Sequence, residues 1–380
     1  MIRSEFKKLG ISTSLLGFGC MRLPTIGGDE TKIDQAAAEA MVDYAYAQGL
    51  NYFDTAYPYH GGTSETFMGR ALKKYPRESF YLADKMPLWD LSTADELESI
   101  FNEQLQKCQV EYFDFYLLHS MDREKLEKVK KINAVEFLRQ KRAEGKIRNI
   151  GFSFHDDAAC LKDILKLFDW DFVQIQLNYA DWSMLDAKEL YQILASQDIP
   201  CIVMEPVRGG FLANLPEKIS GILNESGSQR TQAAWALGWV ASLPNVKVIL
   251  SGMSNMDQLK ENIQLFSSES VRLSEEEKFY VHKAVSALQE IKTVPCTGCR
   301  YCMECNFGVD IPTIFKLYNS YKLFGNTYAF KDGYRKLGNM HQGHNCQACG
   351  ACRSVCPQQI SIPDWLETIQ QEFEKLTKKD

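Results

Sequence analysis

Short apolar runs alternate with longer amphipathic stretches over the first 270 residues of the chain. Each run is rich in aliphatic or aromatic residues, which is typical of a strand buried on both faces. The runs predict strands at Leu50–Thr55, Phe80–Lys85, Phe113–His119, Ile147–Ser153, Phe172–Leu177, Cys201–Glu205 and Val246–Ser251. The amphipathic stretches predict helices at Ile33–Gln48, Thr93–Gln109, Glu124–Glu144, Thr231–Ser242 and Met256–Phe266.

Repeated strand–helix units predict an α/β fold with a parallel sheet. The preferred architecture is a closed TIM (β/α)8 barrel, whose eighth strand lies near the N-terminus or is hidden by weak periodicity. An open doubly wound sheet is the alternative, and it would normally carry a Gly-rich phosphate turn after its first strand. The chain contains no G-x-G-x-x-G, which favours the barrel. The acidic helix predicted at Ser274–Glu290 should end the barrel domain.

Length and composition narrow the possibilities further. A chain of 380 residues exceeds one typical domain, so we expect a barrel domain at 1–290 and a smaller, mainly helical domain at 291–380. The net charge of −6 argues against a general nucleic-acid binder. No apolar run approaches the roughly 20 residues that cross a bilayer, and the N-terminus lacks the apolar core of a secretion signal. We therefore expect a cytoplasmic protein without a membrane or nucleic-acid partner.

The cysteines are concentrated near the C-terminus. Four of the twelve are scattered before residue 295, and the other eight form two runs: Cys296-x2-Cys299-x2-Cys302-x2-Cys305 and Cys346-x2-Cys349-x2-Cys352-x3-Cys356-Pro357. In a reducing compartment such crowding indicates metal or redox chemistry rather than disulfides. Asp310-Ile-Pro312 follows the first run and Ser361-Ile-Pro363 follows the second, so the two halves are predicted to be copies of one unit.

The second run matches the ligand pattern of bacterial ferredoxins, and the segment resembles a two-cluster [4Fe–4S] ferredoxin module split by a helical insert at about Pro312–Asn345. The resemblance implies crossed ligation: Cys296, Cys299, Cys302 and Cys356 would hold one cluster, and Cys346, Cys349, Cys352 and Cys305 the other. The first run is one residue shorter in its last gap, before Cys305. Paired zinc sites are the alternative, because C-x2-C pairs also bind zinc. Two runs of three or more spaced cysteines favour iron–sulfur clusters.

Polar residues stand at the ends of three successive predicted strands. Asp54 and Tyr59 follow the first clear strand, Lys85 ends the next, and His119 ends the third. In a parallel barrel all carboxyl-terminal strand ends meet at one rim, where active sites form. Each residue alone would be an ordinary rim or surface residue, whereas together they predict a catalytic group.

Residues 5–270 resemble the aldo-keto reductase family in the order of their motifs. These motifs begin with Leu16-Gly17-Phe18-Gly19 and end with Gln258 and Asn262. The resemblance implies a barrel that binds NADH or NADPH without a Rossmann fold, and a catalytic tetrad of Asp54, Tyr59, Lys85 and His119. Tyr59 would give a proton to the substrate carbonyl, and a nearby ammonium is expected to lower the tyrosine pKa. Asp54 would keep Lys85 charged, and His119 would position the carbonyl.

The same resemblance implies contacts to the dinucleotide. Ser153 and Gln176 match positions that hold the nicotinamide carboxamide, and Tyr179 would lie near the ring. The remaining expected contacts come from rim loops: Arg22, Glu205, Arg208, Gly209, Ser251, Ser254, Gln258 and Asn262. No cation stands at Gly252 or Gln258, where members that prefer NADPH bind its 2′-phosphate, so NADH and NADPH both remain open.

The sequence predicts an oxidoreductase that reduces a small carbonyl compound and carries two clusters. Clusters pass single electrons whereas nicotinamide passes hydride, so a direct circuit would need a flavin or a partner such as a ferredoxin or flavoprotein. No flavin fingerprint is present, although barrels bind FMN without one. The clusters would transfer electrons, close a structural domain or sense oxidation. The alternative function is an iron–sulfur electron-transfer protein whose barrel binds nicotinamide as a regulatory or docking module.

Overall fold

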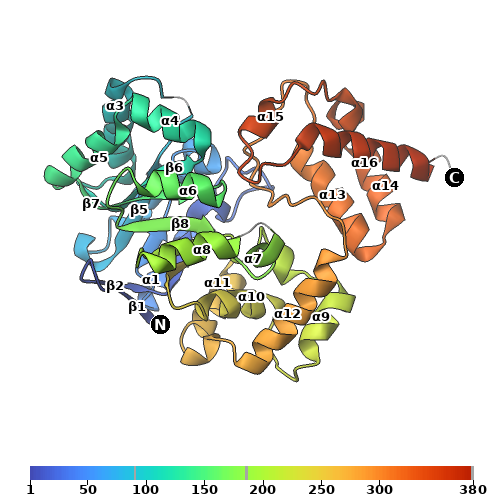
Figure 1. The fold of residues 1–380 in the computed structure, drawn as a ribbon, viewed down its shortest axis with the longest axis horizontal. Helices are drawn as coiled ribbons and strands as arrows, with labels where there is room; N and C mark the ends of the chain where they lie inside the picture. The colour runs from blue at the N-terminus through green and yellow to red at the C-terminus, as the bar shows by residue number, and fades with distance from the viewer. Residues whose placement is uncertain (90, 185–186, 378–380) are drawn as a thin grey trace. The chain divides into compact units, whose positions relative to one another are not determined.

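The computed structural model describes residues 1–89, 91–184 and 187–377. The chain forms two compact units (Figure 1). The first, here the barrel unit, comprises Met1–Val207 and Ala234–Glu275, and the second, here the cysteine unit, comprises Arg208–Ala233 and Glu276–Asp380. The domain limits at 1–290 and 291–380 stay a prediction. Among the described residues no helix is long and apolar enough to span a membrane.

The barrel unit contains the predicted closed barrel, which in the described residues has eight parallel strands in the order β10-β3-β4-β5-β6-β7-β8-β9. The sequence prediction of a (β/α)8 barrel is therefore confirmed, and the missing eighth strand is β3. The strands are β3 (Leu16–Gly19), β4 (Tyr52–Asp54), β5 (Tyr81–Met86), β6 (Phe113–Met121), β7 (Ile147–Phe154), β8 (Phe172–Gln176), β9 (Cys201–Met204) and β10 (Val246–Ser251).

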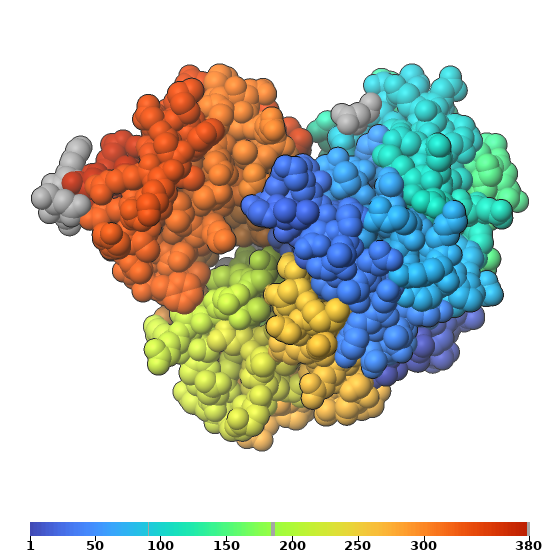
Figure 2. Space-filling view, turned by 180° about the vertical axis from the view of Figure 1, so that it is seen from behind, coloured from blue at the N-terminus to red at the C-terminus, as the bar shows by residue number. Residues whose placement is uncertain are grey.

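Glycines explain why β3 is hard to see in the sequence. A Cβ atom at Gly17 would lie 2.7 Å from the Val248 side chain, and one at Gly19 would lie 3.2 Å from the Ser251 carbonyl oxygen. Both contacts are with β10. At these two positions β3 and β10, the first and last barrel strands, lie too close together to accommodate a side chain. Closure also brings helix α11 (Met256–Leu265) beside α1 (Gln35–Ala47), gold and blue in Figure 2.

The helices of the barrel unit cover the outside of the sheet (Figure 1). They are α1, α2 (Ser64–Leu72), α3 (Ala94–Cys108), α4 (Arg123–Lys131), α5 (Ala134–Ala143), α6 (Ala158–Leu165), α7 (Asp181–Met184), α8 (Ala187–Ser196), α10 (Gln232–Ala241) and α11. The prediction of a single helix at Glu124–Glu144 is wrong. Asn133 adopts a left-handed conformation with φ 54° and divides it into α4 and α5, a conformation that asparagine tolerates better than most residues.

Aromatic side chains fill the inside of the barrel. Phe115 on β6 lies 5.0 Å between ring centroids from both Tyr52 and Phe172. Phe6 belongs to the same cluster, and it comes from a separate antiparallel hairpin of β1 (Arg3–Phe6) and β2 (Ile11–Ser14). The interior is therefore a packed core, which leaves the carboxyl-terminal rim as the place for chemistry.

The cysteine unit is helical. Its helices are α9 (Glu217–Asn224), α12 (Glu275–Gln289), α13 (Ile311–Phe324), α14 (Thr327–Lys336), α15 (Ala351–Ser354) and α16 (Ile362–Thr377). Ion pairs Arg230–Glu277 at 2.7 Å and Lys283–Glu225 join the segment around α9 to α12. Helices α13, α14 and α16 share a core of buried aliphatic and aromatic side chains, around which the cysteines pack.

Close packing of α2 on the end of α3 generates a stability prediction. A Cβ atom at Gly69 would lie 2.6 Å from the Cys108 carbonyl carbon, so Gly69→Ala should destabilise the barrel unit by about 1–3 kcal/mol. Gly221→Ala in α9 is the matched control, because nothing lies within 4 Å of its Cβ position and alanine favours helix by up to about 1 kcal/mol. Thermal unfolding followed by circular dichroism measures both. Equal destabilisation by the two substitutions would contradict the packing argument.

Candidate active site and iron–sulfur centre

An ion pair lies at the carboxyl-terminal ends of β4 and β5. The Lys85 Nζ atom donates to Asp54 Oδ1 at 2.6 Å and to the Thr55 carbonyl oxygen at 2.7 Å. Both side chains are buried, and their strands are neighbours in the barrel. An ammonium in such surroundings needs a nearby anion to stay charged, and Asp54 supplies one. The sequence-predicted pairing of these two residues is thus reproduced in the geometry.

Tyr59 is hydrogen-bonded to the same ammonium. It begins a short 3₁₀ turn, Tyr59–Gly62, after β4, and its hydroxyl accepts a hydrogen bond from Lys85 Nζ at 3.3 Å. Burial raises the pKa of Tyr59 well above 10, and the carboxylate of Asp54 raises it further. A lowering by Lys85 stays a prediction, whereas the pKa as a whole is raised because the loss of hydration dominates. The phenol is therefore protonated and able to donate.

His119 faces the tyrosine from β6. Its ring lies 6.2 Å from that of Tyr59 and 5.1 Å from that of Trp89, measured between centroids. Burial lowers the pKa of His119 well below 6.5, and the positive charge of Lys85 lowers it further. The imidazole is therefore neutral near pH 7. A neutral ring can still donate one hydrogen bond, which is the role expected of it.

The expected nicotinamide contacts lie on the next strands of the rim. Ser153 on β7 accepts a hydrogen bond at its Oγ from the Ser120 N–H at 2.7 Å. Gln176 on β8 donates from Nε2 to Asp181 Oδ2 at 2.7 Å. The ring of Tyr179 is buried, and its centroid lies 6.5 Å from that of Trp239 in an edge-on arrangement. These bonds fix polar groups at neighbouring strand ends.

The other expected dinucleotide contacts belong to both units of the chain. In the barrel unit, Arg22 pairs with Glu205 at 4.0 Å, and Asn262 donates to Ser251 Oγ at 3.0 Å. Ser254 donates from its backbone N–H to Gln258 Oε1 at 2.8 Å, so these two exposed residues engage each other at the start of α11. Arg208 and Gly209 belong to the cysteine unit, although only two residues separate Arg208 from Glu205.

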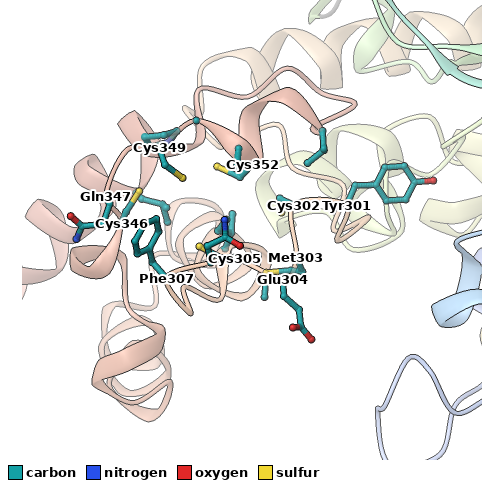
Figure 3. A pocket seen from close by; sticks show the side chains of 17 residues that line it. Tyr301, Cys302, Met303, Glu304, Cys305, Phe307, Cys346, Gln347, Cys349 and Cys352 are labelled. Carbon is teal, nitrogen blue, oxygen red and sulfur yellow. The ribbon is translucent and has the colours of Figure 1, made fainter. Parts of the chain in front are cut away.

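The eight clustered cysteines form two groups in the cysteine unit. Cys296, Cys299, Cys302 and Cys356 line a narrow cavity of about 20 Å³. Cys305, Cys346, Cys349 and Cys352 line a larger cavity of about 250 Å³, which Cys302 also borders (Figure 3). Burial raises the pKa of Cys352 to about 11, and the neighbouring Cys346, Cys305 and Cys349 raise it further. All twelve cysteines are free thiols, so the grouping is not imposed by disulfides.

The two cysteine runs have the same backbone conformation. In both, the second and fourth residues after the first cysteine are left-handed: Gly298 and Arg300 in one run, Ala348 and Gly350 in the other. The match continues beyond the last cysteine of each run. Gly308, three residues after Cys305, and Gln359, three residues after Cys356, are both left-handed. Gly308 donates to the Cys305 carbonyl and Gln359 to that of Cys356. The shorter gap before Cys305 therefore shifts the register by one residue and preserves the loop.

Comparison with known proteins matches the two parts of the chain separately. Residues 15–285 match the model of the aldo/keto reductase family. The chain belongs to the aldo/keto reductase family. Residues 295–360 match the model of a 4Fe-4S dicluster domain, so this aldo/keto reductase is an oxidoreductase fused to an iron–sulfur domain.

Relatives of this aldo/keto reductase cover its barrel. A probable aldo-keto reductase of Glycine max is 24% identical over 73% of this chain and 86% of its own length. The NADH-specific methylglyoxal reductase of Escherichia coli is 25% identical over 74% and 95%. The holo form of an aldo-keto reductase from Bacillus halodurans superposes with a TM-score of 0.63 at 25% identity, over 75% of this chain and 96% of that one.

The residues present fit the groups that the family and the domain imply. The barrel rim offers oriented amide and hydroxyl groups from Gln176 and Ser153, which suit a nicotinamide carboxamide. In the cysteine unit the Gly298 N–H donates to Cys296 Sγ at 3.4 Å, as backbone amides do around thiolates of iron–sulfur clusters. The family thus implies NAD or NADP, and the dicluster domain implies iron–sulfur clusters.

Sequence reasoning missed the polar groups behind the tetrad. Asp84 accepts from the Lys85 N–H at 2.8 Å, and burial raises its pKa well above 3.8, which the nearby Glu65 carboxylate raises further. Gln104 Nε2 donates both to Glu65 at 2.9 Å and to the Lys85 carbonyl at 3.0 Å. The signal was present, because an acidic residue inside an apolar strand is unusual. Asp181, which holds Gln176, was likewise overlooked.

The neutral His119 makes stability depend on pH. The unfolded chain takes up a proton on this residue below pH 6.5, whereas the folded chain does not, so folding free energy is lost as the pH falls through that range. When the pH is lowered from 7.5 to 5.5, the free energy of unfolding of His119→Gln should therefore fall by about 1.4 kcal/mol less than that of the parent. Urea unfolding measures this difference. His282→Gln, at an exposed position, is the control. The same acid sensitivity in parent and His119→Gln would contradict a neutral buried imidazole.

Proposed function

We propose that this aldo/keto reductase reduces a small aldehyde or ketone to the alcohol with a nicotinamide dinucleotide, with Tyr59 as the proton donor. The observation that carries the proposal is the single hydrogen-bonded group made by Asp54, Lys85 and Tyr59 at the barrel rim. When bound, the reduced dinucleotide supplies the hydride, which forms the new C–H bond. The carbonyl oxygen then needs one proton, and the chain has a protonated phenol to give it.

The tetrad supports this proton transfer electrostatically. As the Tyr59 O–H bond breaks, negative charge develops on the phenolate oxygen, 3.3 Å from the Lys85 ammonium. A buried cation stabilises that charge more than water would, because the surroundings have a low dielectric constant. Asp54 pairs with Lys85 at 2.6 Å and holds its Nζ in place. His119, neutral and opposite the tyrosine, donates a hydrogen bond to the same carbonyl oxygen and so orients the substrate.

NADH and NADPH are both proposed as cofactors. The E. coli relative is named as NADH-specific. The loop at Gly252 carries no cation of its own, but the Arg22 side chain lies against it, with its Cβ and Cγ atoms 3.3 Å from the position of a Cβ at Gly252. Arg22 thus brings a positive charge beside the loop where a phosphate group of either dinucleotide is proposed to bind. Dissociation constants for the two, measured by fluorescence titration, determine the preference.

We also propose that the cysteine unit binds two [4Fe–4S] clusters with crossed ligation and exchanges electrons with an external ferredoxin or flavoprotein. The grouping of the thiols around two cavities supports the ligand sets. The exposure of Cys349 supports an external partner, because it places the second cluster near solvent. Carbonyl reduction by hydride and proton consumes no electrons from the clusters.

Removing the phenol tests the proposed acid. Tyr59→Phe should lower kcat for aldehyde or ketone reduction about 10²–10⁴-fold, because general acid catalysis is lost. The dissociation constant of the dinucleotide should stay within about threefold of the parent value, because no bond to the dinucleotide is removed. Tyr57→Phe is the matched control, since Tyr57 is half-buried and its hydroxyl points to Glu103 at 3.4 Å. Full activity of Tyr59→Phe would refute the assignment.

Iron analysis tests the clusters. After anaerobic reconstitution the parent should hold about eight irons and absorb broadly near 400 nm. Cys349→Ser should lose about half of both, whereas Cys160→Ser, in the barrel, should lose neither. Carbonyl reduction should continue in Cys349→Ser, because the hydride does not pass through the clusters. Two zinc ions and no colour in the parent would contradict the proposal, and lost turnover in Cys349→Ser would contradict the separate roles.

A further inference from the structure

The loop after β9 touches the first cysteine run. A Cβ atom at Gly209 would lie 2.9 Å from the carbonyl carbon and 3.1 Å from the Cα of Thr297, and closer still to the Thr297 oxygen. Both residues belong to the cysteine unit, and Thr297 is buried. Backbone therefore lies directly on backbone at this point, which only glycine permits.

The conformation of the loop is unusual and needs support. Arg208, Gly209 and Gly210 are three consecutive left-handed residues, with φ of 49°, 63° and 88°. A non-glycine residue in that region costs on the order of 1 kcal/mol, so Arg208 keeps this conformation only where its surroundings hold it. Arg208 is buried, its guanidinium lies 5.8 Å from the centre of the Phe211 ring, and Phe211 donates from its N–H to the Arg208 carbonyl at 3.1 Å.

Thr297 is fixed from one side by protein. Asn319 on α13 holds the residue two positions before Cys296: its Oδ1 accepts from the Val294 N–H at 2.8 Å and its Nδ2 donates to the Val294 carbonyl at 2.7 Å. On the other side Thr297 lies between Cys296 and Cys299, two ligands of the first proposed cluster. Ligand segments of metal sites are ordered by the metal and loosen without it.

We infer that the first cluster, through the contact of Thr297 with Gly209, holds the left-handed segment Arg208–Gly210 in place and so orders the loop that follows β9. The inference rests on the proposed first cluster and not on the proposed reaction. Gly209 is a positioning residue. The loop is also tied covalently to the barrel rim, because Glu205, which pairs with Arg22, precedes Arg208 by three residues. Order at Thr297 is thus transmitted along a short segment of chain.

Substitutions at two neighbouring glycines distinguish the effect of this contact from the effect of backbone strain. Gly209→Ala and Gly210→Ala both place alanine at positive φ, but nothing lies within 4 Å of the Cβ position of Gly210. In cluster-loaded protein, the amides of residues 206–213 should exchange at least tenfold faster in Gly209→Ala than in the parent. Gly210→Ala should change their exchange rates less than threefold. Equal effects of the two substitutions would overturn the inference.

Removal of the clusters tests the same contact from the side of Thr297. Amides of residues 206–213 should exchange at least tenfold faster after the clusters are removed by an iron chelator, and in cluster-loaded Gly209→Ala. Cluster-loaded Cys349→Ser, which retains the first cluster, should match the parent. Unchanged exchange after cluster removal would overturn the inference even if the carbonyl reductase proposal stands. Conversely, full activity of Tyr59→Phe would remove the proposed reaction and leave the exchange result to decide the contact.

Discussion

The buried ammonium of Lys85 is the constraint around which the active site is arranged. Its desolvation is offset by Asp54 at 2.6 Å and by the Thr55 carbonyl at 2.7 Å. Leaving either charge without its partner in such a place would cost about 3–5 kcal/mol. β4 and β5 must therefore be neighbours in the correct register, because only that register puts the carboxylate beside the ammonium. The requirements of the fold and of the chemistry coincide at this pair.

Two groups near the same ammonium, Tyr59 and His119, are both kept uncharged. Burial keeps Tyr59 protonated, and Lys85 contributes to keeping His119 neutral. In the proposed reaction, both would donate hydrogen bonds to one carbonyl oxygen without charging first. The phenolate left on Tyr59 would lie 3.3 Å from the Lys85 ammonium. On this proposal, the site stabilises the charge that develops during the reaction rather than the resting phenol.

The spacing of residues in the sequence was sufficient to predict those features in which each position requires one particular type of residue. Seven strands, the rim positions of the tetrad and the duplicated cysteine runs were all predictable from apolar runs and ligand spacing. β3 was obscured because its glycines serve close packing against β10. The break at Asn133 was missed because the apolar spacing continues across it. The direction of the Tyr59 pKa required knowledge of burial, which a pattern of residue types does not contain. The placement of Arg208 and Gly209 in the cysteine unit depends on a long excursion after β9.

That excursion explains how a barrel can acquire an iron–sulfur domain without disturbing its chemistry. The tetrad, β4, β5 and β6 all precede the point at which the chain leaves the barrel after Val207. Segment Arg208–Ala233 packs with α12 and the first cysteine run, as the Arg230–Glu277 pair and the Gly209–Thr297 contact show. The chain that follows β9 therefore folds with the second unit, where the proposed clusters can order it. The residues proposed for proton transfer all precede it in the sequence.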